Sequence, residues 1–199
     1  MKEKVGSVHM LLNVAGIDYE GGFMERDIQT VLSILKLNLE ATLRITHMAL
    51  EQRNGDEMFY VVFVSSLASL TPIPLKATYA ASKRFLLDFS YAIREELRLQ
   101  NVSVLSLCPG GLATTKEAIS GIAAQGFFGN ATTNHLEKVV HRTIARALAN
   151  KALYVPGMLN RMFRLLGGLV PRTMLTRLLY ARWTNAQQKW LKKDGKCLQ

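Results

Sequence analysis

Apolar residues in the first 156 positions form short unbroken runs that alternate with longer stretches at helical spacing. The runs "VHMLLNVAG" (8–16), "MFYVVFVSS" (58–66) and "VSVLSLCPGG" (102–111) predict three buried strands, and "ALYVPG" (152–157) predicts a brief fourth strand. The stretches 25–53, 77–100 and 135–149 repeat apolar residues in a way that predicts helices. Residues 111–133 are rich in Gly, Ala and Thr and predict a loop with some short helix.

Continuous apolar strands that alternate with helices are typical of a parallel sheet covered on both faces. We therefore expect an α/β fold with a doubly wound, Rossmann-like parallel sheet. One domain is predicted over 1–156, and 157–199 is predicted to be a basic amphipathic helical tail that is not an independent domain.

The formal net charge of +10 is concentrated in that tail, where 157–199 holds 9 Lys/Arg and a single Asp. The first residues lack the pattern of a signal peptide, and no apolar run reaches the roughly 18 residues of a membrane span. Cys108 and Cys197 lie far apart, and the four histidines have no ligand spacing, so no metal is assigned. These features predict a reduced, cytoplasmic location, with peripheral membrane contact as an option for the tail.

Candidate chemistry begins with "TYAASK", in which Tyr79 and Lys83 lie one helical turn apart. A nearby ammonium favours a phenolate, so such a tyrosine could exchange a proton with an alcohol or a carbonyl oxygen. The structural alternative is a tyrosine at the start of an amphipathic helix and a solvated surface lysine. Because ligands of open α/β sheets bind beyond the carboxyl ends of the strands, the polar and small residues at three strand ends favour a site.

Three further polar positions accompany the pair. Ser66 could hydrogen-bond a substrate carbonyl or only a loop amide. Asn38, inside an apolar helix, could hold a water that links the lysine to solvent or could bond a neighbouring helix. Pro109-Gly110 could end a strand, and Thr114 could be an ordinary loop hydroxyl.

Together these residues resemble the short-chain dehydrogenase/reductase family over roughly residues 8–156. "NVAG" (13–16) is similar to the family's NNAG motif, "YAASK" (79–83) to its YxxxK pair, and "PGGLAT" (109–114) to its PGxVxT turn. Asn38 and Ser66 are similar to the family's helix asparagine and catalytic serine.

The resemblance implies a role for each position. Tyr79 would be the general acid/base, Lys83 would lower its pKa and bind the nicotinamide ribose, Ser66 would orient the carbonyl, and Asn38 would anchor a proton-relay water. The cofactor NAD or NADP would be bound by Asn13, Ala15, Gly16, Tyr79, Lys83, Pro109, Gly110, Leu112 and Thr114. Val14 and His9 depart from the family pattern without removing a catalytic group.

A larger departure concerns the cofactor loop. Family members carry a glycine-rich turn similar to TGxxxGIG before the NNAG strand, and this turn holds the pyrophosphate at a helix N-terminus. Here the matching strand begins at about residue 8, so we expect an N-terminally truncated form with strands 4–7 of the family and weak dinucleotide binding. Either the chain is part of a longer enzyme, the favoured explanation, or it is a short protein that retains catalytic residues without cofactor affinity.

The tail admits several roles. Arg161, Arg164, Arg172, Arg177 and Arg182 alternate with Leu, Met and Phe, which suits an anionic membrane surface or a lid over the substrate; nucleic acid is disfavoured. Phe127 and Phe128 hint at a hydrophobic substrate. The sequence thus predicts an oxidoreductase for a carbonyl/alcohol pair, with an inactive membrane-surface or partner-binding protein as the alternative. Family habit implies a homodimer or homotetramer.

Overall fold

The computed structural model describes residues 8–114, 119, 122–123, 130–167 and 170–193. Its sheet contains β1 (Met10–Asn13), β2 (Phe59–Val64), β3 (Val102–Leu107) and β4 (Leu153–Tyr154), in the spatial order β1-β2-β3-β4. Each neighbouring pair is parallel. The predicted α/β fold with a parallel sheet is confirmed, and all four strands fall within the predicted runs.

Helices connect these strands. The main ones are α1 (Ile28–Leu35), α2 (Thr42–Gln52), α3 (Ala77–Glu96), α6 (Leu136–Leu148), α7 (Met158–Gly167) and α8 (Arg172–Lys193). Short 3₁₀ turns, η1 (Phe23–Glu25) and η3 (Leu67–Leu70), precede α1 and α3. The single helix expected over 25–53 is interrupted by a π-helical segment, η2 (Lys36–Ala41), between α1 and α2. Phe127 and Phe128, to which we gave a role in substrate binding, lie outside the described residues.

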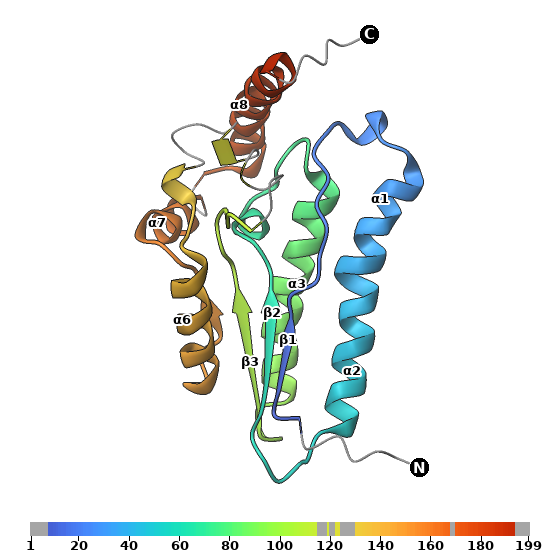
Figure 1. Cartoon of the computed structure of the whole chain (residues 1–199), viewed down its shortest axis with the longest axis vertical. Coiled ribbons are helices and arrows are strands. Elements are labelled where there is room, and N and C mark those ends of the chain that lie inside the picture. Colours follow the sequence, from blue (N-terminus) through green and yellow to red (C-terminus); the bar gives the residue numbers. More distant parts are fainter. Residues whose placement is uncertain (1–7, 115–118, 120–121, 124–129, 168–169, 194–199) are drawn as a thin grey trace.

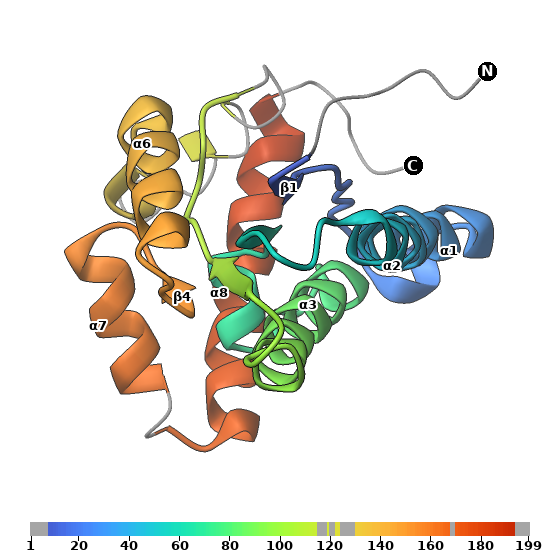
Figure 2. The ribbon, with the colours of Figure 1, turned by 90° about the horizontal axis from the view of Figure 1, so that it is seen from below.

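The two faces of the sheet are packed by alternate residues of the same strands. Phe59, Val61 and Phe63 of β2 pack with Leu86 and Ile93 of α3 on one face. Val62, between them, packs with Val139 and Ala147 of α6 on the other face. Figure 2 shows α1, α2 and α3 on one side of the strands and α6 and α7 on the other. This two-sided burial explains why β2 and β3 read as unbroken apolar runs.

Helix α8 lies beyond the carboxyl ends of the strands, toward which the arrow of β3 points in Figure 1. Across the described part of the chain, no helix is both long enough and apolar enough to traverse a bilayer. The tail predicted to be helical is helical in α7 and α8. Because α8 covers the end of the sheet where ligands of such folds bind, its position bears on the site.

Candidate functional site

A cavity of about 1030 Å³ lies at the carboxyl ends of β1, β2 and β3. Eight of the eleven candidate catalytic and cofactor-binding residues line it, from four different segments: Gly16, Ser66, Tyr79, Lys83, Pro109, Gly110, Leu112 and Thr114. Its remaining wall is mainly apolar and includes Leu67, Leu70, Ile73, Phe163, Val170, Leu175 and Leu179. The wall of the cavity therefore includes residues from α7 and α8 as well as from the strand ends.

Tyr79 and Ser66 meet at this cavity. Tyr79 lies in the first turn of α3, and Ser66 follows β2 and caps η3, where its Oγ accepts a hydrogen bond from the Ala68 amide at 3.1 Å. Burial raises the pKa of the Tyr79 phenol, with a further increase from Asp18, while a hydrogen bond with Ser66 and the charge of Lys76 act in the opposite direction. The phenol is thus held in its protonated form, as a proton donor requires.

Lys83 lies one turn further along α3 and is only 4 % exposed. Its Nζ donates a hydrogen bond to the Val64 carbonyl at 2.9 Å and lies 5.7 Å from the centre of the Tyr79 ring. Burial lowers its pKa to about 8. The backbone approaches this ammonium closely at Gly16, where a Cβ would lie 3.0 Å from Lys83 Nζ.

The structure departs here from one implied role. Lys83 was expected to lower the pKa of Tyr79, yet the lowering influences on the phenol come from Ser66 and Lys76, and burial outweighs them. The reason is that burial lowers the pKa of Lys83 to about 8, so this lysine is already neutral in the pH range where the Tyr79 phenol loses its proton.

Asn38 is fully buried in the π-helical segment and does not line the cavity. Its Nδ2 donates to the Ile17 carbonyl at 3.0 Å and to Ser82 Oγ at 3.1 Å, and its Oδ1 accepts from the Ile17 amide at 2.9 Å. Both amide hydrogens are therefore used within the protein, so only Oδ1 has capacity left for a water. The side chain ties the loop after β1 to α3, which is the structural role weighed against the water-relay role.

The cofactor positions divide into two groups. Pro109, Gly110, Leu112 and Thr114 lie along the cavity, and a Cβ on Gly110 would come within 1.9 Å of the Thr132 carbonyl oxygen. By contrast, Asn13 and Ala15 are not among the residues that line it. Asn13 Nδ2 donates instead to Thr46 Oγ1 of α2 at 3.0 Å, which fixes β1 against the helix.

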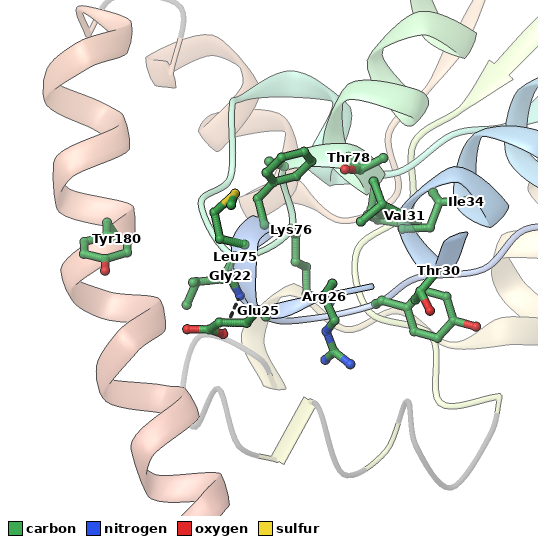
Figure 3. A pocket seen from close by; sticks show the side chains of 16 residues that line it. Gly22, Glu25, Arg26, Thr30, Val31, Ile34, Leu75, Lys76, Thr78 and Tyr180 are labelled. Atoms are coloured by element: carbon green, nitrogen blue, oxygen red, sulfur yellow. Dashed lines mark hydrogen bonds between the residues drawn. The ribbon is translucent and has the colours of Figure 1, made fainter. Parts of the chain in front are cut away.

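Sequence reasoning missed three charged residues at the cavity: Asp18, Glu20 and Lys76. Lys76 Nζ lies 2.5 Å from Asp18 Oδ2 and 5.9 Å from the Tyr79 ring centre. It also lines a second cavity of about 380 Å³, drawn in Figure 3, whose wall includes Tyr79 as well. The signal that could have revealed Lys76 is its distance of three residues from Tyr79; nothing in the sequence pointed to Asp18.

Comparison with known protein families gives a match to the family described as short chain dehydrogenase, over residues 1–125. One relative is the ketoacyl reductase HetN of Nostoc sp., 28 % identical over 152 residues, which cover 76 % of this chain and 52 % of HetN. Another is the NADPH-dependent 1-acyldihydroxyacetone phosphate reductase of Schizosaccharomyces pombe, 33 % identical over 109 residues, 55 % of this chain and 36 % of the relative. The chain thus spans about half or less of the length of these relatives.

Among solved structures, a 7beta-hydroxysteroid dehydrogenase superposes with a TM-score of 0.74 and 18 % identity. The superposition covers 85 % of this chain and 66 % of that one. At such low identity the likeness concerns the fold alone, and it agrees with the parallel sheet and flanking helices described above.

Proposed function

The chain belongs to the short chain dehydrogenase family, and on this basis we propose that it serves an NAD(P)-dependent oxidoreductase that interconverts a carbonyl and a secondary alcohol. Tyr79 would be the general acid/base, Ser66 would orient the carbonyl oxygen, and Lys83 would supply a positive charge beside them. The two relatives reported above carry the word reductase in their names, which supports the reaction class.

One observation carries the proposal: Ser66, Tyr79 and Lys83 line a single cavity at the carboxyl ends of parallel strands. Ser66 lowers the pKa of the Tyr79 phenol, and the Lys83 ammonium is 5.7 Å from the phenol ring centre. A hydroxyl, a phenol and an ammonium in one apolar enclosure have stronger electrostatic effects on a bound carbonyl than they would have in water.

In the reduction direction, the substrate oxygen accepts hydrogen bonds from Ser66 and Tyr79. As negative charge develops on that oxygen, the phenol transfers its proton to it, and the resulting phenolate is stabilised by Ser66 and Lys76, the two groups that lower its pKa. Because its pKa is raised, the Tyr79 phenol carries its proton at neutral pH before the transfer. In the oxidation direction the same phenolate would take the proton back from the alcohol.

The cavity fits the nicotinamide end of the cofactor. Pro109, Gly110, Leu112 and Thr114 offer one wall, and Lys83 has N–H groups beyond the one bonded to Val64 for a ribose hydroxyl. A reduced nicotinamide bound there would supply the hydride that the carbonyl carbon accepts. The chain's own residues would bind and orient the two partners and deliver the proton.

A hydrophobic substrate, and an acyl chain in particular, suits the rest of the cavity. Leu67, Leu70 and Ile73 face it from the segment after β2, and Phe163, Leu175 and Leu179 face it from α7 and α8, with Arg182 on the same wall. HetN is named a ketoacyl reductase, and the S. pombe relative is named a 1-acyldihydroxyacetone phosphate reductase, so both names contain an acyl group. We therefore propose a 3-oxoacyl compound as the first substrate to try.

The test is reduction of a 3-oxoacyl-CoA by NADPH, followed by loss of NADPH absorbance, in the wild type and the Tyr79→Phe variant. The variant should lose activity by a factor of about 10² to 10⁴, because it retains the ring and lacks the proton. Tyr91→Phe is the matched control, since Tyr91 lies on the same helix and is 43 % exposed. Undiminished activity in Tyr79→Phe would refute the assignment.

A second candidate function concerns the surface of α7 and α8. Met158, Met162 and Leu165 of α7 are 78 %, 49 % and 68 % exposed and follow one another at helical spacing, with Arg161 and Arg164 beside them. Met174 and Leu178 of α8 are also exposed, on either side of Arg177. Exposed apolar residues interleaved with arginines favour binding to an anionic membrane surface, alone or together with catalysis on a lipid-like substrate.

A further inference from the structure

Two lysines, not one, approach the ring of Tyr79. Lys76 precedes α3 and Lys83 follows Tyr79 by one turn, with ammonium nitrogens 5.9 and 5.7 Å from the ring centre. Lys76 Nζ also lies 2.5 Å from Asp18 Oδ2 and 3.4 Å from Glu20 Oε2. Only 15 % of the Lys76 side chain is exposed, so this cation is largely removed from water.

The backbone around Lys76 is held in an unusual conformation. Leu75 has φ +64°, in the left-handed region that large side chains seldom adopt, and its carbonyl accepts a hydrogen bond from the Gly21 amide at 2.8 Å. Gly21 belongs to the same loop as Asp18 and Glu20. The strained turn is thus joined to the loop that supplies both carboxylates.

The loop is fixed from its other end as well. Glu25 accepts a hydrogen bond from the Gly22 amide at 2.8 Å, the contact drawn as a dashed line in Figure 3, and Arg26 donates to the Glu20 carbonyl. Lys76 and Tyr79 are both part of the wall of the cavity shown there and of the larger one. The ion pair therefore stands between the two cavities, next to the proton donor.

Lys76 departs from two local rules of helix formation. Ser, Thr, Asp and Asn are the side chains that cap a helix N-terminus, and Lys76 occupies the N-cap of α3 without a side-chain cap bond. A cation at this end also opposes the helix dipole. A residue that breaks local rules beside a reactive group suggests a role in the site rather than in the helix.

The carboxylates of Asp18 and Glu20 limit the roles that Lys76 can have in the site. Asp18 and Glu20 already neutralise the ammonium, and together they leave the cluster with one excess negative charge at neutral pH. Such a cluster repels an anionic substrate group, so Lys76 is poorly suited to bind a phosphate or a carboxylate. The Tyr79 ring lies beside the same ammonium, 5.9 Å from Lys76 Nζ to the ring centre.

We propose that Lys76 is a positioning residue for the proposed reaction: Asp18 and Glu20 hold its ammonium beside Tyr79, and the cluster fixes the phenol and the charge around it. The inference rests on the proposed function of Tyr79. The groups facing the phenol are then Ser66 after β2, Asp18 in the loop after β1, and Lys76 and Lys83 of the α3 segment, with Glu20 acting through Lys76.

In this arrangement, Asp18 and Lys76 have opposite effects on the pKa of Tyr79. Asp18 raises the pKa of Tyr79 and Lys76 lowers it, beside the larger effect of burial. Lys76→Met should therefore raise the pKa of the phenol, because it removes the cation and leaves Asp18 unneutralised. Asp18→Asn should lower the pKa, because it removes an anion and leaves the cation. A merely structural ion pair predicts no such opposition.

The experiment is a pH titration of Tyr79 in the full chain, followed by the ¹³Cζ NMR signal of labelled tyrosine, with Tyr79→Phe used to assign the resonance among six tyrosines. We expect shifts on the order of one pH unit, upward in Lys76→Met and downward in Asp18→Asn, and wild-type behaviour in Lys76→Arg. Arg84→Met is the matched control, since Arg84 forms a solvent-facing ion pair with Asp88 on the same helix, at 2.7 Å.

Absent shifts, or shifts of the same sign in both variants, would overturn the inference. If Lys76→Met does not fold, the direction of the shift in Asp18→Asn decides the question alone. A kinetic comparison distinguishes failure of the proposed function from failure of the proposed role of Lys76. Full activity in Tyr79→Phe would refute the proposed function. If Tyr79→Phe is inactive while Lys76→Met keeps the wild-type pH profile of kcat, only the role of Lys76 fails.

Discussion

At the scale of single residues, Lys83 places an ammonium group in a buried position, where a charge is poorly solvated. It is 4 % exposed, and the one hydrogen bond described for its ammonium goes to the Val64 carbonyl. Burial lowers its pKa from 10.5 to about 8. The protein thus retains, next to Tyr79, a cation that destabilises the folded state near neutral pH, which is typical of a functional rather than a structural lysine.

This cost predicts a pH dependence of stability. Between pH 8 and 10.5 the unfolded chain binds more protons at Lys83 than the folded chain does, so the free energy of unfolding contributed by this group rises with pH. The difference in unfolding free energy between wild type and Lys83→Met should rise over that window, by at most about 3 kcal/mol. Urea unfolding at several pH values measures it.

Arg84→Met serves as the control for that series, because Arg84 is an exposed neighbour on the same helix. Comparing each variant with wild type removes the contributions of Lys76 and Tyr79, which are present in all three proteins. A difference that is flat or falls between pH 8 and 10.5 would show that Lys83 is not desolvated in the folded protein.

The residues that sequence reasoning found and those it missed differ in a physical way. Tyr79 and Lys83 are four positions apart on one helix, so their proximity is a local property. Asp18 and Lys76 are 58 positions apart and meet only because the loop after β1 folds against the start of α3. Asn13 was expected near the cofactor, but its amide bonds Thr46, a choice that depends on where α2 lies.

At the scale of elements, strands were easier to predict than the interior of helices. Val61 and Val104 are fully buried because both faces of the sheet are covered, and this produces the unbroken apolar runs. The π-helical segment Lys36–Ala41 could not be read in the same way, since apolar residues continue through it at helical spacing. It is stabilised by tertiary bonds from Asn38 to Ile17 and Ser82.

The exposed apolar residues of α7 give a prediction about membranes. If the stripe of Met158, Met162 and Leu165 inserts into an anionic interface, the double change Met158→Gln and Leu165→Gln should weaken binding at least about tenfold, because two apolar side chains are lost from the contact. Co-sedimentation with vesicles of phosphatidylcholine and phosphatidylserine measures the effect.

Leu99→Gln is the control for this experiment, since Leu99 is 84 % exposed and follows α3, far along the chain from the stripe. The arginines predict in addition that binding decreases with salt. A wild-type protein that stays in the supernatant with anionic vesicles at low salt would eliminate the membrane role of α7 and α8.

At the scale of the whole molecule, the N-termini of α1, α3 and α6 are unfavourable for a pyrophosphate. The start of α1 is capped by the Asp27 carboxylate, which accepts from the Thr30 amide at 3.1 Å, and α6 has Glu137 in its first turn. Lys76, at the start of α3, is already paired with two carboxylates. Within the described residues, these three N-termini are therefore poor binding sites for a phosphate, the group that a helix N-terminus would otherwise bind.

The nicotinamide end of the cofactor should therefore contribute much more to the binding free energy than the pyrophosphate and adenosine do. We predict that this chain binds NADPH and NADH with dissociation constants above about 1 µM, and that reduced nicotinamide mononucleotide binds within about tenfold of them. The physical reason is that Lys83 and the segment 109–114 offer contacts to the shared half, while the N-termini of α1, α3 and α6 offer few to the pyrophosphate.

Isothermal titration calorimetry with the three ligands tests this directly, and Lys83→Met should reduce the binding of all of them by a similar factor because Lys83 faces their common half. Sub-micromolar binding of NADPH, or an advantage of 100-fold or more over the mononucleotide, would mean that a strong pyrophosphate site exists after all. Such a result would also require that site to use groups other than the N-termini of α1 and α6, since their acidic residues disfavour a phosphate.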